Sequence, residues 1–168
     1  MKLGLEGKTA IVTGGSKGIG LETVRLLAEE GVKVLACSRR EDALAECRAD
    51  VEKTTGVKIE TFSLDVTDVK QIERLPAVAS ERLVRIDILV NNAGTGTYKP
   101  FLEVTDEELQ YGMAINFFAQ FRICQRIIPI KVEQNGRVLF ICCAGCEDEV
   151  QKNFEASLKK VGQESKTE

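Results

Sequence analysis

The sequence predicts an α/β fold, a doubly wound parallel sheet with helices on both faces, and three observations lead to that prediction. Short apolar runs of strand length alternate with segments that carry apolar residues at helical spacing. A glycine-rich turn, T-G-G-S-K-G-I-G over residues 13–20, joins the first apolar run to the first helical segment. Polar residues follow later apolar runs, at Asp65 and Asn91. Because parallel strands bring their carboxyl ends to one edge, these groups should meet the glycine turn there.

The first half of the chain alternates strands and helices. We expect buried strands at residues 8–13, 32–37 and 57–64, since each is a short, largely apolar run. The helix expected over residues 18–30 stops at Gly31, and its apolar face is made of Ile19, Val24, Leu27 and Ala28. The next helix stops before Gly56, and its apolar face is made of Leu44, Cys47 and Val51.

The second half continues the alternation with one long helix. A weaker helix follows from Asp68, and Pro76 is expected to break or restart it. Residues 86–90 form a fourth strand, and residues 94–103 form a loop. A capping box at residues 105–108 then opens a long helix that Pro129 ends, with an inward face of Leu109, Met113, Phe117, Cys124 and Ile128. Residues 137–142 are the fifth strand evident in the sequence, and a last amphipathic helix is marked by Val150, Phe154, Leu158 and Val161.

The bulk composition favours one domain with a small-molecule partner. A chain of 168 residues can bury a single core without disulfide staples. With 23 basic and 26 acidic residues and no long run of one sign, nothing indicates a nucleic-acid or membrane surface. The first residues are too short and polar for a signal peptide, and no apolar run approaches the roughly 18 residues of a spanning helix, so we expect a cytoplasmic protein.

The cysteine and histidine content restricts the possible chemistry. The 6 cysteines show no framework spacing, so we expect reduced thiols in the core or at strand ends. The absence of histidine excludes an imidazole base and most zinc sites. Cys143 and Cys146 form a C-x-x-C, but no histidine or second pair accompanies them, and we expect no metal site.

The glycine-rich turn is interpreted as a phosphate-binding site. Gly14, Gly18 and Gly20 lie where a side chain would block the tight turn, the approach of a pyrophosphate, or the packing of helix on strand. Ser16, Lys17 and Ile19 belong to the same turn, and the helix that begins there directs its free N–H groups to it. A glycine turn can also serve purely steric needs, but this one follows a strand and opens a helix within a unit of about 30 residues.

T-G-G-S-K-G-I-G together with N-N-A-G at residues 91–94 resembles the short-chain dehydrogenase/reductase family of the classical type, whose glycine pattern is G-x-x-x-G-x-G. The resemblance extends from Lys8 through Cys143 and implies a Rossmann-like domain, expected over residues 1–146, with a divergent helix and tail over 147–168. It also implies hydride transfer between a nicotinamide cofactor and a small carbonyl or alcohol substrate.

The same resemblance implies roles for individual residues. Asp65, beside Val66, would bond the adenine amino group, Asn91 would order the central strand, and Asn116 would hold a water of the proton relay. The cofactor contacts implied by the N-N-A-G motif are Asn92, Ala93 and Gly94. From the residues alone, the less favoured alternatives are that Asp65 serves a strand-end turn and that Asn116 caps or bends its helix.

Charge at the end of the second strand favours NADP over NAD. A carboxylate there would bond the ribose 2′-hydroxyl of NAD and repel a 2′-phosphate. The chain instead has Ser38, Arg39 and Arg40 after Cys37, and Lys17 adds a further cation. Cations and a hydroxyl around one phosphate suit NADP. The alternative is that both arginines merely cap a solvated helix start.

The reaction centre departs from the family pattern. The family uses a serine after the fifth strand and then Tyr-x-x-x-Lys, whereas the only tyrosines here, Tyr98 and Tyr111, lie upstream. Cys143 occupies the usual serine position, and a thiol is a poor hydrogen-bond donor. We therefore expect an NADP-dependent oxidoreductase with impaired turnover. The alternatives are a non-catalytic dinucleotide-binding or interaction module and an incomplete fragment.

The chain ends before the final strands that the resemblance implies, which leaves open a natural short form, a fragment and an altered end. An unpaired fifth strand would expose an apolar edge. We expect residues 147–161 to cover that edge, or a second copy to pair with it as a homo-oligomer.

Overall fold

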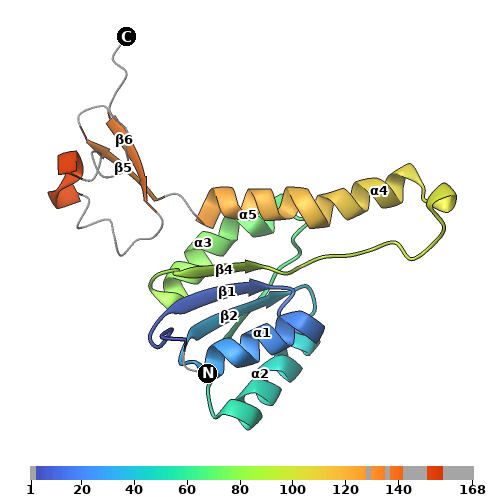
Figure 1. Ribbon diagram of the computed structural model, residues 1–168, viewed down its shortest axis with the longest axis horizontal. Coiled ribbons are helices and arrows are strands. Elements are labelled where there is room, and N and C mark those ends of the chain that lie inside the picture. Colours follow the sequence, from blue (N-terminus) through green and yellow to red (C-terminus); the bar gives the residue numbers. More distant parts are fainter. Residues whose placement is uncertain (1–2, 128–129, 135–136, 142–150, 157–168) are drawn as a thin grey trace.

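The computed structural model describes residues 3–127, 130–134, 137–141 and 151–156 and centres on a parallel four-stranded sheet with the order β3-β2-β1-β4 (Figure 1). The register places Thr13 beside Cys37 on one side and beside Asn91 on the other. Three strands thus end level with one another, as the sequence predicted. The strands are β1 (Thr9–Thr13), β2 (Lys33–Ser38), β3 (Glu60–Ser63) and β4 (Ile88–Asn91).

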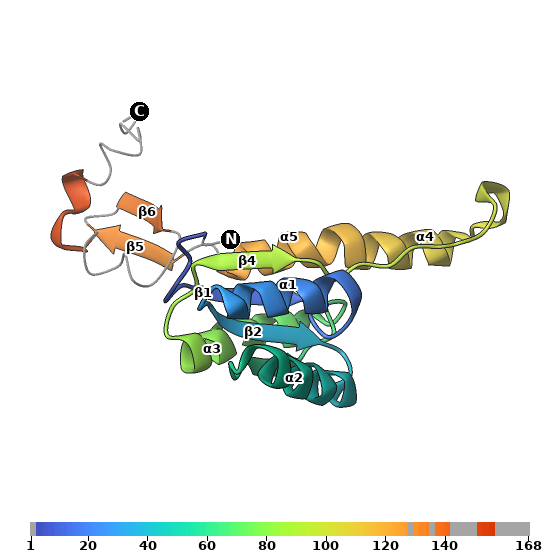
Figure 2. The ribbon, with the colours of Figure 1, turned by 60° about the horizontal axis from the view of Figure 1, so that its bottom comes forward.

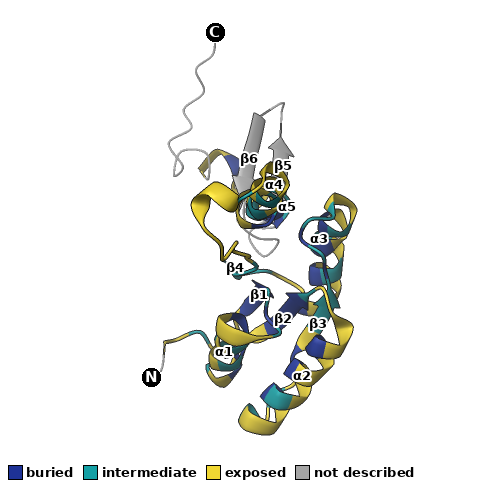
Figure 3. Ribbon diagram, turned by 90° about the vertical axis from the view of Figure 1, so that its right-hand side faces the viewer, coloured by how far each residue is buried: buried dark blue, intermediate teal, exposed yellow. Residues whose placement is uncertain are grey.

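Helices cover both faces of this sheet, so that it is buried between two layers (Figure 3). Ile11 of β1 faces one hydrophobic cluster, while its neighbours Ala10 and Val12 face the other. This alternation explains why a central strand is apolar at consecutive positions. One face is covered by α1 (Gly18–Glu29) and α2 (Glu41–Thr55), and the other by α3 (Val69–Leu83) and α5 (Gln120–Ile127).

Most of the predicted features of the first half are confirmed. Gly56 ends α2 in the left-handed conformation, with φ of 72°, which glycine adopts without steric cost. Ile19 is an exception, because it is 81% exposed rather than on the inward face of α1. The inward position next to it belongs to Gly20, and the buried face of α1 continues through Val24 and Ala28.

Pro76 does not break its helix. Asp68 caps α3 by accepting hydrogen bonds from the backbone N–H groups of Lys70 and Gln71, and the helix then runs through Pro76 to Leu83. The buried face of α3 consists of Ile72, Leu75, Ala79 and Leu83. We attribute the continuity to this packing, since burial of such a face outweighs the loss of one backbone hydrogen bond.

The predicted capping box is confirmed, but the predicted inward face of the long helix is wrong. Thr105 and Glu108 exchange the two capping hydrogen bonds at the start of α4 (Asp106–Met113). The helix then continues through the π-helical segment η2 (Ala114–Ala119) into α5. Of the residues expected inside, Leu109, Met113 and Phe117 are exposed, Cys124 is half-buried, and Ile128 lies outside the described residues. The buried face is instead formed by Ile115, Ala119, Ile123 and Ile127.

The position of α4 explains this correction. In Figures 1 and 2 the helix extends past the sheet, and the segment that precedes it, including the short 3-10 helix η1 (Phe101–Glu103), lies at the far end. Residues of α4 have no sheet beneath them, and none of them is buried. Burial begins at Ile115, where the helix reaches the hydrophobic cluster.

The predicted fifth parallel strand is also wrong. Residues 137–141 do form a strand, β6 (Arg137–Ile141), but it pairs antiparallel with β5 (Ile130–Gln134) in a separate two-stranded sheet. The intervening sequence is Asn135-Gly136, the dipeptide most typical of a tight hairpin. Pairing across so short a connection closes a much smaller loop than addition to the parallel sheet. β4 is therefore an end strand of the four-stranded sheet.

Of the predicted last helix, residues 151–156 are described, and Phe154 among them is buried as expected. Within the described ranges, no helix combines the length and the apolar character needed to cross a bilayer.

Candidate functional site

A cavity of about 300 Å³ opens at the carboxyl ends of β1, β2 and β4. This is the edge at which the sequence placed the glycine turn and the polar strand ends. The cavity brings together residues from across the first two thirds of the chain. Its lining consists of Gly14, Lys17, Ser38, Arg39, Leu64, Asp65, Val66, Asn92, Ala93, Gly94, Thr95 and Ile115.

The glycine turn is held tightly against the end of β4. Gly14 has a φ of 65°, and a Cβ there would lie 2.9 Å from both Ala93 Cα and Asn92 Nδ2. A Cβ on Gly20 would collide with the carbonyl oxygen of Gly14 and lie 2.5 Å from Asn92 Nδ2. Gly18 also has a positive φ, 54°, but a Cβ on it would meet nothing within 4 Å. Gly14 and Gly20 are thus required by close packing, while Gly18 borders open space.

Asn92 and Thr13 connect the turn to β4. The Asn92 side chain donates from Nδ2 to the carbonyl oxygens of Thr13, at 3.0 Å, and Gly14, at 3.1 Å. In return, Thr13 Oγ1 accepts from the backbone N–H groups of Asn92 and Ala93, each at 3.1 Å. Thr13, which is buried, is not among the residues that the sequence predicts for the site. The Asn91 side chain donates to Cys124 Sγ at 3.3 Å and so connects the end of β4 to α5.

One wall of the cavity is cationic and hydroxyl-rich. Lys17 stands immediately before α1, and Ser16 Oγ donates to Ser38 Oγ at 2.8 Å. Arg39 Nη1 donates to the phenol oxygen of Tyr111 at 3.0 Å. Within the described part of the chain, neither Lys17 nor Arg39 forms an ion pair. This wall therefore carries positive charge that no carboxylate of the described residues offsets by direct contact.

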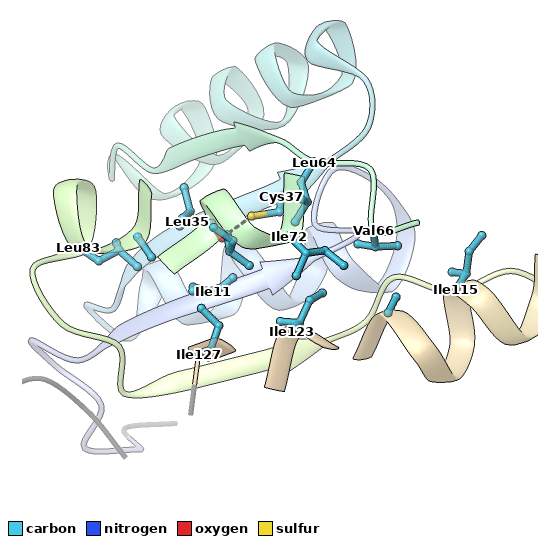
Figure 4. Close-up of a cluster of buried hydrophobic side chains, with 13 residues drawn as sticks. Ile11, Leu35, Cys37, Leu64, Val66, Ile72, Leu83, Ile115, Ile123 and Ile127 are labelled. Carbon is cyan, nitrogen blue, oxygen red and sulfur yellow. Dashed lines mark hydrogen bonds between the residues drawn. The ribbon is translucent and has the colours of Figure 1, made fainter. Parts of the chain in front are cut away.

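The opposite wall is apolar, with one carboxylate beside it. Leu64, Val66 and Ile115 belong to the hydrophobic cluster on the α3 and α5 side of the sheet, and Figure 4 shows them at its end nearest the glycine turn. Between the first two lies Asp65, whose Oδ1 accepts from Thr67 N at 2.8 Å and from Thr67 Oγ1 at 2.7 Å. The Oδ2 atom accepts no hydrogen bond from the described residues, so Asp65 closes a strand-end turn and still offers an acceptor.

Asn116 lies in η2, near the cavity but not in its lining. Its Oδ1 accepts from Thr95 N at 2.9 Å, and its Nδ2 donates to Thr95 O at 2.7 Å. The Asn116 amide thus forms two hydrogen bonds with the backbone of the loop that follows β4. A π-helical segment frees backbone groups and often accompanies functional residues. Cys143, the other residue expected at the reaction centre, lies outside the described residues.

Most residues that the sequence assigned to cofactor binding lie together in the cavity wall, and four do not line it. Ser16 donates a hydrogen bond to Ser38, Gly20 is buried, and Gly18 and Ile19 are exposed at the start of α1. Three further lining residues, Leu64, Thr95 and Ile115, are not predicted from the sequence. Leu64 is the last residue of a predicted strand, and this position could have indicated that it lines the cavity. Thr95 has no such local signal, and only its contact with Asn116 connects it to the site.

The thiols near the site are poor nucleophiles. Burial raises the pKa of Cys37 to about 12, and burial also raises the pKa of Cys47, so both stay protonated at neutral pH. Among the described residues, no group of three or more His, Cys, Asp or Glu side chains could hold a metal ion.

A family of known proteins matches most of this chain. The profile of the short chain dehydrogenase family matches residues 8–157. A tropinone reductase homologue of Arabidopsis thaliana is 40% identical over 139 residues, which are 82% of this chain and 52% of the relative.

Solved structures agree with this match. L-sorbose reductase from Gluconobacter frateurii, complexed with NADPH and L-sorbose, has a TM-score of 0.69 and 31% identity over 74% of this chain and 48% of its own. NAD⁺-bound xylitol dehydrogenase has a TM-score of 0.68 and 28% identity over 73% of this chain and 47% of its own. The chain spans about half the length of these relatives. From the profile and the relatives together, we conclude that the chain belongs to the short-chain dehydrogenase family.

Proposed function

We propose that the cavity at the carboxyl end of the sheet binds NADP, and that the protein transfers hydride between the nicotinamide and a small carbonyl or secondary alcohol. The observation that carries the cofactor choice is the cationic wall. Lys17 and Arg39 border the cavity without an ion-pair partner in the described part of the chain, and Ser38 lies beside them. A 2′-phosphate brings two negative charges and several acceptor oxygens to this position.

The remaining residues of the cavity fit the other parts of the dinucleotide. Leu64, Val66 and Ile115 offer an apolar surface for an adenine ring, and Asp65 Oδ2 offers an acceptor for its amino group. The open space at Gly18 and the free N–H groups at the start of α1 suit a pyrophosphate. When bound, the nicotinamide supplies or accepts the hydride.

We propose further that this chain by itself binds the cofactor with little or no turnover. Proton transfer to the substrate oxygen requires a donor, and the Tyr-x-x-x-Lys pair that the family uses is absent from the sequence. Tyr98 is 99% exposed, and the Tyr111 phenol is bonded to Arg39 at the cationic wall. We assign a water-holding role to Asn116 and a weak donor role to Cys143. Titration with NADPH, followed by fluorescence, tests binding, and reduction of a panel of small ketones tests turnover.

Two charge-reversal variants at adjacent positions test the cofactor choice. Arg39→Asp should weaken NADPH binding by at least 10-fold and leave NADH binding unchanged or improved. Arg40→Asp is the matched control, because it changes the net charge equally while Arg40 pairs with Asp42 at 3.2 Å outside the cavity lining. Unchanged NADPH affinity in Arg39→Asp, or equal losses in both variants, would overturn the assignment.

A further inference from the structure

We propose that Tyr111 is a positioning residue for cofactor selectivity, which holds the guanidinium of Arg39 at the cavity for the 2′-phosphate of NADP. This inference rests on the proposed function, since it concerns the same phosphate. The contact joins residues 72 positions apart, from the end of β2 and from α4, so neither local sequence pattern indicates it.

Arg39 is fixed at both ends. Its backbone carbonyl accepts a hydrogen bond from Ser63 Oγ at 3.2 Å, and its Nη1 donates to the Tyr111 oxygen at 3.0 Å. Tyr111 lies one helical turn before Ile115, and residues four apart share a helix face. Because Ile115 lines the cavity, this spacing brings the phenol to the same side of the helix. The side chain of Tyr111 is 47% exposed, so the contact is not a consequence of core packing.

The chemistry of the partner distinguishes Arg39 from its neighbour. Arg40 is paired with the carboxylate of Asp42 at 3.2 Å, which offsets its charge. The phenol of Tyr111 is neutral, so it orients the Arg39 guanidinium while leaving its full charge available. A guanidinium has five N–H donors, and this contact uses only one, which leaves enough for bidentate binding of a phosphate. Restricting a long side chain before the ligand arrives reduces the ordering cost of binding.

In the opposite role, the same contact would withhold Arg39, because Tyr111 would compete with the phosphate for the guanidinium. The two roles differ in sign. If Tyr111 positions Arg39, removal of its hydroxyl weakens binding of a 2′-phosphate. If Tyr111 withholds Arg39, removal of its hydroxyl strengthens that binding.

The experiment compares adenosine 2′,5′-bisphosphate with adenosine 5′-monophosphate by isothermal titration calorimetry on the full chain. Tyr111→Phe should weaken binding of the bisphosphate by roughly 3- to 10-fold, the loss expected for one ordinary hydrogen bond at a half-exposed site, and leave the monophosphate within about 2-fold. Tyr98→Phe is the matched control, because Tyr98 is 99% exposed and makes no hydrogen bond to the described residues. It should change neither affinity.

A double-mutant cycle shows whether Tyr111 acts through Arg39. In an Arg39→Ala background, Tyr111→Phe should cause no further loss. An unchanged or tighter bisphosphate affinity in Tyr111→Phe, or equal losses for both probes, would overturn the positioning role and leave NADP binding intact. If the original chain does not prefer the bisphosphate, the proposed cofactor choice fails and the inference fails with it.

Discussion

Replacing Gly20 with alanine is predicted to destabilise the chain by about 2–4 kcal/mol. The added Cβ would collide with the Gly14 carbonyl oxygen and lie 2.5 Å from Asn92 Nδ2, well inside the 3.4 Å at which ordinary contacts begin. The turn or the start of α1 must therefore move. Overpacking of this kind costs about 1–3 kcal/mol. The movement also breaks the 3.1 Å hydrogen bond from Asn92 to Gly14, which adds about 0.5–1.5 kcal/mol.

Urea unfolding followed by far-ultraviolet circular dichroism measures this loss. Gly112→Ala is the matched control, because Gly112 lies in α4 and a Cβ there meets nothing within 4 Å. That variant should gain roughly 0.5–1 kcal/mol, since alanine favours helix over glycine. If Gly20→Ala unfolds at the same urea concentration as the original chain, the close approach of turn and helix is not the reason for glycine at this position.

Two further predictions concern titratable groups. Burial alone would raise the pKa of Asp87, but hydrogen bonds from Arg85 and Thr9 outweigh it and lower that pKa. Asp87→Asn should therefore cost about 1–3 kcal/mol in urea unfolding above pH ~4, and the difference should vanish as the pH falls through the lowered folded-state value. Because burial raises the pKa of Cys37 to about 12, its thiol should resist iodoacetamide at pH 8 until the chain unfolds, as followed by mass spectrometry. Rapid native labelling of Cys37 would contradict the burial.

The first half of the fold follows from local sequence signals. Apolar spacing places Val24, Ala28, Leu44 and Val51 in the core, and Gly56 ends α2, because each of these effects acts within one element. The glycine turn likewise determines where the cavity forms. Sequence patterns are sufficient there because strand, turn and helix follow one another directly in the chain.

The errors arise where the outcome depends on distant partners. Leu109 and Met113 have helical apolar spacing, but α4 extends past the sheet, and both side chains stay exposed in the part of the chain that the structure describes. Residues 137–141 have a strand sequence, yet strand propensity does not specify the partner, and the nearby β5 forms the pair. The contacts of Asn116 with Thr95 and of Arg39 with Tyr111 join separate elements, so no local pattern indicates them.

The apolar wall of the cavity has a thermodynamic consequence, because Leu64, Val66 and Ile115 belong to the main hydrophobic cluster. A molecule bound against this wall is released when the cluster unfolds. Binding of the ligand to the cavity therefore raises the free energy of unfolding of the chain. A ligand present at 100 times its dissociation constant would raise the free energy of unfolding by about 2.7 kcal/mol. Thermal melts in the presence of candidate dinucleotides would thus rank them by affinity, whether or not the chain catalyses a reaction.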